Sequence, residues 1–189
     1  MDLFARADGA QMNISIFHPP PVPINEAKRD AAVSASGALE ALDDPVLGRL
    51  AEGVCRSLDV SASLLSILHR DTQYVIAAHG IATGAYRRKN SFSGHAIASG
   101  HDVFFVPDLL ADDRFADNPW VNGDIARFRF YVAAIIRPDG EHAIGTISAV
   151  DPTARATLAP HARNVMVSAS SAVTERLQQL QLRSPSADD

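Results

Sequence analysis

The sequence has very few cysteines: Cys55 is the only one among its 189 residues. The chain therefore cannot form an intramolecular disulfide or a zinc cluster of several thiolates, which suits a reducing compartment. It also lacks an excess of basic residues, because 17 Lys and Arg stand against 22 Asp and Glu, giving a formal net charge of −5. Nucleic-acid binding relies on basic side chains that neutralise phosphates, so we expect no nucleic-acid partner.

Long apolar runs are missing as well. No stretch approaches the ~20 consecutive apolar residues of a membrane span, and the first residues lack the basic and apolar regions of a signal peptide. We therefore expect a cytoplasmic protein with no membrane partner. Apolar residues make up 47% of the chain and charged residues 21%, which is typical of a globular protein, and the length fits a single domain with extensions.

The composition changes along the chain and predicts three parts. Residues 1–23 end in the proline-rich segment 18–23, whose fixed φ angles favour an extended arm or linker. Met12 is a candidate natural start within this arm. Residues 24–182 are the expected domain, and residues 183–189 are a polar tail.

Three main helices are predicted from the spacing of apolar residues. The first covers residues 25–42, with Asn25 as the N-cap and Glu26 in the first turn. The second opens at Pro45 behind an aspartate cap and carries an apolar stripe through residue 58. The third covers residues 159–182, with apolar residues three and four positions apart along one seam.

Strand patterns fill the middle of the chain. Residues 63–68 and 74–78 predict one hairpin, and residues 128–137 and 143–150 predict another across the turn at 138–140. Residues 102–106 predict a further strand, and residues 94–99 a short helix. We expect residues 80–90 to form an exposed loop. Residues 108–126 contain seven Asp or Asn, and loops of this length are often functional.

A series of short motifs follows the same order as in a known family. It begins with Pro23-x-Asn25-Glu26-x-x-Arg29, Ser91-Phe92-x-x-His95-Ala96-Ile97 and Val106-Pro107-Asp108. It continues with Asp113-Arg-Phe-Ala-Asp-Asn-Pro-x-Val121, Arg129-Phe130-Tyr131, Asp139-Gly140 and Ile144-Gly145-Thr146. Over residues 23–182 the chain resembles a GAF domain, of the bacterial sensor type that often precedes cyclase, kinase or phosphodiesterase modules. Here we expect the domain to stand alone.

The resemblance implies an α+β fold, with a central antiparallel sheet of about six strands and helices on both faces. It implies that the N- and C-terminal helices lie on one side, and that a ligand such as a cyclic nucleotide or tetrapyrrole lies between the sheet and residues 91–126. The implied ligand-binding residues are Phe92, Ser93, His95, Asp108, Phe115, Asn118, Trp120, Arg129, Tyr131 and Ser148.

The chain departs from the family at two positions that matter for chemistry. Ser93 and Ser148 stand where the family frequently has cysteine. Relatives that reduce free methionine sulfoxide need two thiols, and bilin-binding relatives attach the pigment to a cysteine near the pocket. Cys55, on a predicted helix, supplies neither arrangement. The histidines show no metal-ligand spacing and no catalytic motif is present, so we expect no metal site and no catalytic residue.

Three features allow two interpretations each. His95 either contacts the ligand or donates to a backbone carbonyl, and we favour the second. The acidic residues of 108–113 either bind a cation or brace the loop, and we favour bracing, with Arg114 paired to Asp108. Trp120 is either a lid over the pocket or an anchor of the loop, and both interpretations stay open.

The interpretation we favour is a non-catalytic regulatory protein that binds an unknown small molecule. We expect a homodimer through the N- and C-terminal helices, because their apolar seams exceed what one sheet face absorbs, and a separate output protein is a further possible partner. One alternative is an interaction scaffold whose pocket is filled by Phe92, Phe115, Phe128 and Phe130. A less favoured alternative is a redox enzyme of the free methionine sulfoxide reductase type. The identity of a ligand or cofactor is unknown.

Overall fold

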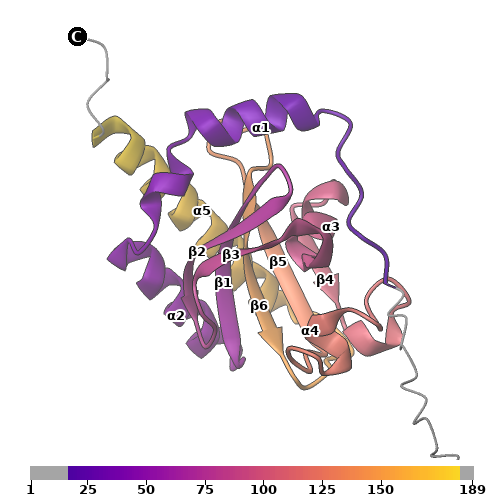
Figure 1. The fold of residues 1–189 in the computed structure, drawn as a ribbon. Helices are drawn as coiled ribbons and strands as arrows, with labels where there is room; N and C mark the ends of the chain where they lie inside the picture. Colours follow the sequence, from indigo (N-terminus) through magenta and orange to yellow (C-terminus); the bar gives the residue numbers. More distant parts are fainter. Residues whose placement is uncertain (1–16, 184–189) are drawn as a thin grey trace, which may run out of the picture.

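A computed structural model describes residues 17–183, and the remaining parts of the predicted arm and tail lie outside the described residues. Six strands form one antiparallel sheet in the order β3-β2-β1-β6-β5-β4 (Figure 1). The strands are β1 Ala62–His69, β2 Thr72–His79, β3 Gly84–Arg87, β4 Val103–Val106, β5 Phe130–Ile136 and β6 Gly145–Asp151. The helices are α1 Glu26–Ala35, α2 Pro45–Leu58, α3 Phe92–Ala98, α4 Pro119–Asn122 and α5 Pro160–Arg183.

Helices cover both faces of the sheet, and two separate clusters of buried residues result. Helices α1, α2 and α5 contribute to the cluster on one face, and α3 and α4 contribute to the cluster on the other. The α+β fold, with its six-stranded antiparallel sheet and its terminal helices on one side, is therefore confirmed.

Strand β5 shows how the sequence divides its side chains between these two clusters. All seven of its residues are buried. Val132, Ala134 and Ile136 join the cluster beneath α2 and α5, while Tyr131, Ala133 and Ile135 join the cluster beneath α3. Side chains of a strand alternate between faces, so Phe130 points toward the terminal helices. The alternative in which Phe130 fills the pocket is therefore wrong for that residue.

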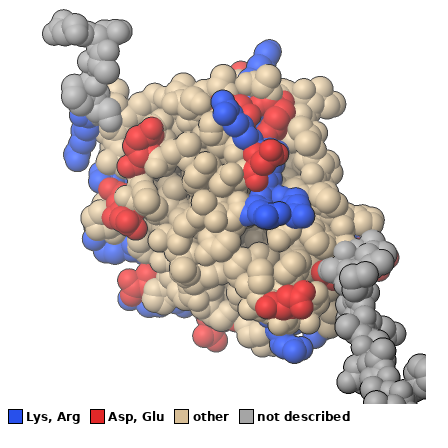
Figure 2. Space-filling view, viewed as in Figure 1, with Lys and Arg blue, Asp and Glu red and all other residues tan. Residues whose placement is uncertain are grey.

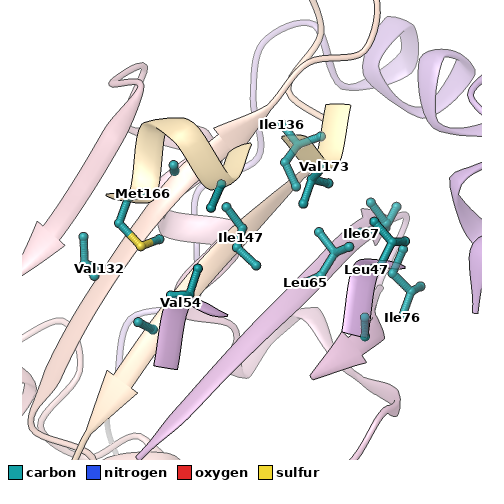
Figure 3. Packing of buried hydrophobic residues seen from close by; sticks show 14 of the residues in the cluster. Leu47, Val54, Leu65, Ile67, Ile76, Val132, Ile136, Ile147, Met166 and Val173 are labelled. Atoms are coloured by element: carbon teal, nitrogen blue, oxygen red, sulfur yellow. The ribbon is translucent and has the colours of Figure 1, made fainter. Parts of the chain in front are cut away.

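The long terminal helix α5 packs onto the sheet beside α2. Figure 3 shows Met166 and Val173 of α5 and Val54 of α2 directed at strand residues such as Ile147. Met166 and Val173 are 0% exposed, and burying such a side chain contributes roughly 1.5–3 kcal/mol. Our expectation that the sheet leaves this apolar seam partly unabsorbed is wrong for most of α5, because Met166, Ala169, Val173 and Leu177 are buried within one chain and only Leu180 stays half-buried.

The N-terminal helix is shorter than its apolar pattern predicts. It ends at Ala35, and Gly37 follows with a φ of +64°. That left-handed conformation ends the helical path, and residues Ala38–Ala41 form a separate 3₁₀ turn. Helix α2 begins as predicted at Pro45, and its cap is Asp44, whose side chain accepts hydrogen bonds from the backbone N–H groups of Val46 and Leu47.

Residues 80–90, which we expected to be an exposed loop, contain the edge strand β3 and a 3₁₀ turn, Arg88–Asn90. Pairing joins the backbone of β3 to β2, with Gln73 opposite Tyr86. The expectation is wrong for these residues because an edge strand exposes most of its side chains and shows little apolar alternation.

A buried cluster of charges joins α1 to the sheet. The Arg29 side chain is 1% exposed and donates to both Glu26 oxygens, at 2.9 and 2.7 Å, and to Asp30 at 2.6 Å. It also donates to the backbone oxygen of Leu68 in β1. Arg88 donates to Glu26 and, at 2.9 Å, to the backbone oxygen of Arg70. Figure 2 shows acidic and basic residues interleaved in a short band at the α1 end of this face.

The described end of the predicted arm lies against the domain. The N–H of His18 donates to the backbone oxygen of Arg114 at 3.1 Å. Pro20 lies so close to Gly94 of α3 that a Cβ atom at Gly94 would be 2.6 Å from the Pro20 Cγ atom. Residues 17–23 therefore run past α3 before α1 begins (Figure 1). Within residues 17–183 no helix combines the length and the apolarity needed to cross a bilayer.

Candidate functional site

A pocket with a cavity volume of about 40 Å³, partly open to solvent, lies between the sheet and the segment that contains α3 and α4. Its floor comes from strands β1, β2, β3, β5 and β6. Its other walls come from the start of α3, from α4 and from the loops around them. The lining residues are Leu64, Gln73, Val75, Ile81, Tyr86, Asn90, Ser91, Phe92, Ser93, Trp120, Phe128, Tyr131, Ser148 and Val150.

The deep end of the pocket holds a cluster of buried hydroxyl groups. The Ser93 hydroxyl lies 3.3 Å from the Tyr131 hydroxyl and accepts a hydrogen bond from Thr146 at 2.9 Å. The Ser148 hydroxyl donates to the backbone oxygen of Leu64 at 3.3 Å. Burial raises the pKa of Tyr131 to about 12, so this phenol is neutral at physiological pH. The floor therefore offers polar but uncharged groups.

Aromatic rings form the outer part of the pocket. The Trp120 ring contacts the Tyr86 ring edge-on, with centroids 5.6 Å apart, and stacks on Phe128 at 6.3 Å. Deeper in the site, Phe92 contacts Tyr131 at 5.3 Å. These contacts join β3, α4 and the start of β5 around one opening, and they are favourable geometries for aromatic pairs.

Local sequence signals position the two short helices. Ser91 caps α3, because its hydroxyl accepts a hydrogen bond from the N–H of Gly94 at 3.1 Å. Asn118 caps α4 by accepting from the N–H of Trp120 at 3.0 Å, and Pro119 occupies the first turn. The Asn118 amide also donates to the backbone oxygen of Asn90 at 3.1 Å. This bond holds α4 against the chain that enters α3.

Five of the ten sequence-predicted ligand-binding residues line this pocket: Phe92, Ser93, Trp120, Tyr131 and Ser148. Trp120 combines the two roles that the sequence left open, since it lines the opening and also anchors α4 through its aromatic contacts. The other five residues lie outside the lining. Among them, Asn118 is 2% exposed and acts through its two hydrogen bonds to neighbouring backbone.

His95 lies on the outer side of α3 and not in the pocket. Its Nε2 atom is 2.9 Å from the backbone oxygen of His18, and its ring packs edge-on against Phe115 at 4.7 Å. Burial lowers the pKa of His95 to about 4. A neutral imidazole that donates to a carbonyl is the interpretation that we favoured from the sequence, and the structure has this geometry.

Asp108 and Arg129 pair with each other outside the pocket. The Arg129 Nε atom donates to Asp108 at 2.5 Å, and a second guanidinium nitrogen contacts the other carboxylate oxygen. Our expected pair of Arg114 with Asp108 is wrong. Arg114 donates instead to Asp112, at 2.9 and 2.6 Å, and its guanidinium lies 4.9 Å from the centre of the Phe115 ring. The sequence separation of only two residues between Asp112 and Arg114 explains the preference.

Tyr86, Asn90 and Phe128 line the pocket but were not among the predicted binding residues. Tyr86 and Asn90 fell in the segment that we interpreted as a loop, so their position on the pocket side was not predicted. The alternation of β2 and β3 could have found Tyr86, because it pairs with Gln73 and both residues line the pocket. Phe128 was considered only as a filler of the pocket, and it forms part of its wall.

Thiol and metal chemistry have no centre in this pocket. Cys55, the single cysteine of the chain, lies on α2 at the opposite face, in contact with the backbone oxygen of His79. Burial raises its pKa to about 11. Among residues 17–183 no group of three or more His, Cys, Asp or Glu side chains is arranged to hold a metal ion.

No protein-family model matches the sequence. A curated protein from Pseudomonas aeruginosa, named as a cyclic di-GMP phosphodiesterase, is 34% identical to the chain over 140 residues. This alignment covers 74% of the chain and 24% of the relative. The chain therefore spans about a quarter of the length of this relative.

Solved structures share the fold at low sequence identity. The chromophore-binding domain of an unusual bacteriophytochrome from R. palustris has a TM-score of 0.58 at 16% identity, over 86% of this chain and 64% of that one. Free methionine-R-sulfoxide reductase from Neisseria meningitidis, in complex with its substrate, has a TM-score of 0.56 at 14% identity. The match covers 90% of this chain and 99% of the reductase chain. The GAF domain region of a putative membrane protein from Geobacter sulfurreducens has a TM-score of 0.52 at 15% identity. The match covers 71% of this chain and 89% of the Geobacter chain.

The strand order and the helices on both faces define an antiparallel α+β domain. The chain has the GAF fold, and the resemblance carried by its sequence motifs is confirmed at that level. Proteins of this fold include both chromophore-binding domains and a reductase, so the fold by itself does not decide between binding and catalysis.

Proposed function

We propose that this chain is a non-catalytic regulatory domain that binds a small molecule in the pocket between the sheet and α3–α4. The observation that carries the proposal is the pocket itself, which combines aromatic walls with a few directed polar groups around a cavity of about 40 Å³. Small-molecule sites in proteins typically have this composition and a volume of roughly 300–1,000 Å³, so a ligand would have to part the walls of this pocket on binding. The presence of chromophore-binding domains among the matched structures supports the same role.

The pocket argues against a scaffold whose site is filled by phenylalanines. Phe115 is 0% exposed and packs on Phe92 and His95, outside the lining, and Phe130 belongs to the other face of the sheet. Phe92 and Phe128 form walls and leave space between them. A sulfoxide-reductase activity is disfavoured because the pocket-lining positions Ser93 and Ser148 carry hydroxyls, and a thiol pair is needed for that chemistry.

We also propose that the domain signals as a homodimer through its terminal helices. The buried seam of α5 does not support this, so the support comes from large apolar residues exposed near the helix ends. Ile24 precedes α1, Leu42 precedes α2 at 53% exposed, and Leu182 lies at the end of α5 at 88% exposed. A hollow lined by residues of 37–44 and by Leu180 and Arg183 lies beside Leu42 and the end of α5. Binding would act by stabilising one of two packings of the helices.

Mass spectrometry of small molecules released from protein purified from its own source tests ligand binding. We expect one compound at near-stoichiometric amount, and we expect it to be depleted in Ile81→Phe, which places a ring in the half-buried pocket wall. Ile125→Phe is the matched control, because Ile125 is 56% exposed and lies outside the lining. Equal ligand content in wild type and Ile81→Phe, or no compound in either, would contradict the proposal.

Light scattering coupled to size-exclusion chromatography tests the assembly. We expect a dimer at micromolar concentration, weakened by Leu42→Glu and Leu182→Glu together. A protein that is monomeric throughout this range would refute the dimer while leaving ligand binding to be judged by the first experiment.

A further inference from the structure

The pocket lacks charge on its walls. None of the fourteen residues lining it is Asp, Glu, Lys, Arg or His. Five charged residues are sequence neighbours of the lining residues, and none of these five lines the pocket. These five are Arg87, Lys89, Arg127, Arg129 and Asp151.

Each of these neighbours has its own contacts. Arg87 and Lys89 line a different surface hollow together with Asp71. The guanidinium of Arg127 lies against Gly123, where a Cβ atom would be 2.9 Å from its Cζ atom. Arg129 is paired with Asp108.

Asp151 is likewise engaged, because its side chain accepts hydrogen bonds from the N–H groups of Ser61 at 2.9 Å and Thr153 at 2.8 Å. Figure 2 shows the charged band running from the α1 end to the middle of this face, with a mainly uncharged surface below it.

One polar atom in the pocket wall has no partner. The Asn90 Oδ1 atom is buried and makes no hydrogen bond within the described residues. Its backbone oxygen is occupied by the Asn118 amide at 3.1 Å, so the segment that carries the side chain is held in place. A buried acceptor without a donor is unfavourable, and a ligand that donates a hydrogen bond would satisfy it.

Resting on the proposed function, we infer that the ligand is an uncharged, flat aromatic molecule that donates one N–H or O–H to Asn90 Oδ1. Its ring would part the aromatic walls of Tyr86, Trp120, Phe128 and Phe92, which now enclose a cavity of about 40 Å³, and would contact their rings in favourable geometries. A phosphate or carboxylate in the same place would lose its hydration without gaining a cation. The inference therefore excludes ligands that place an ionised group inside the pocket.

Three probes of nearly equal size separate charge from hydrogen bonding. Benzamide is neutral and has an amide donor, methyl benzoate is neutral without a donor, and benzoate is charged without a donor. Trp120 is the single tryptophan of the chain and lines the pocket, so its fluorescence reports occupancy directly. We expect benzamide to bind best, methyl benzoate more weakly and benzoate at least about tenfold more weakly than benzamide.

The variant Asn90→Leu removes the acceptor and keeps a side chain of similar size. This variant should reduce the affinity for benzamide to that for methyl benzoate. The control Asn164→Leu, on the exposed face of α5, should leave the affinities for both probes unchanged. Circular dichroism of Asn90→Leu establishes that the variant is folded, and Asn90→Ser, which restores a smaller acceptor, should recover part of the benzamide binding.

The inference is overturned if benzoate binds as well as benzamide, if Asn90→Leu leaves the order of the probes unchanged, or if no probe quenches Trp120. None of these three results contradicts ligand binding itself, which is tested by mass spectrometry of the released small molecules. A released native compound that carries a phosphate or carboxylate would support ligand sensing and overturn this inference, whereas the absence of any released compound would overturn the proposed function.

Discussion

Replacing Glu26 by glutamine should weaken the attachment of α1 to the sheet in a way that depends on pH. Glu26 is only 20% exposed, and its carboxylate contacts both Arg29 and Arg88. Burial alone would raise its pKa, but the hydrogen bonds from these two guanidinium groups outweigh burial and lower the pKa of Glu26 from 4.5 to about 2. The ionised carboxylate is therefore favoured by folding.

The loss of stability in Glu26→Gln can be worked out from the lowered pKa of Glu26. A difference of about 2.5 pKa units corresponds to about 3 kcal/mol without solvent screening, and we expect about 2 kcal/mol because part of the side chain reaches water. Because the folded pKa is lowered, the stabilisation is complete above the unfolded pKa of 4.5. It is lost as the pH falls toward about 2. Glutamine does not titrate, so the difference between wild type and Glu26→Gln should shrink over this range.

Urea unfolding followed by circular dichroism at pH 7, 5 and 3.5 measures this difference. Glu52→Gln is the matched control, because Glu52 pairs with Arg56 at 3.6 Å and both side chains are largely exposed. Such a pair contributes about 0.3–0.5 kcal/mol. The reasoning is refuted if Glu26→Gln is as stable as the control at pH 7, or if its deficit stays constant from pH 7 to pH 3.5.

Other substitutions test the packing. Cys55 should react with a disulfide reagent at least about 100-fold more slowly in the native protein than in urea, since burial raises its pKa to about 11; comparable rates would contradict its burial. Gly145→Ala should cost about 3 kcal/mol, because the new Cβ atom would lie 2.2 Å from the Ser66 backbone oxygen. Gly53→Ala, with nothing within 4 Å, should gain about 0.5–1 kcal/mol in urea unfolding. Val173→Ala should cost about 2–3 kcal/mol by the same measurement, and a neutral result would mean that α5 packs less closely on the sheet.

Local and periodic signals were enough to predict most of the fold. Pro45 behind an aspartate marks the start of α2, and alternating apolar residues mark the central strands, because both signals act within a few residues. The end of α1 and the strand β3 were not predicted correctly. The first depends on a left-handed Gly37, and the second on backbone pairing with β2, which leaves little trace in the side chains of an edge strand.

The candidate site was predicted only in part, for a related reason. Phe92, Ser93 and Tyr131 were predicted because they belong to the short motifs that resemble those of a GAF domain. Asp108 and Arg129 carry groups that suit ligand binding, but each is satisfied by the other. Partners in an ion pair depend on distances across the fold, so chemical type alone did not separate a binding residue from a bracing one.

The short segment from Arg88 to Asn90 is held at both of its ends. Arg88 is fixed by Glu26 in the first turn of α1, and the backbone oxygen of Asn90 is fixed by Asn118 beside α4. Asn90 therefore belongs to the pocket wall, while Arg88, two residues earlier, belongs to the anchor of the N-terminal helix. An occupant that displaces Asn90 would therefore strain one of these two attachments, so the pocket and helix α1 are mechanically connected through three residues of the chain.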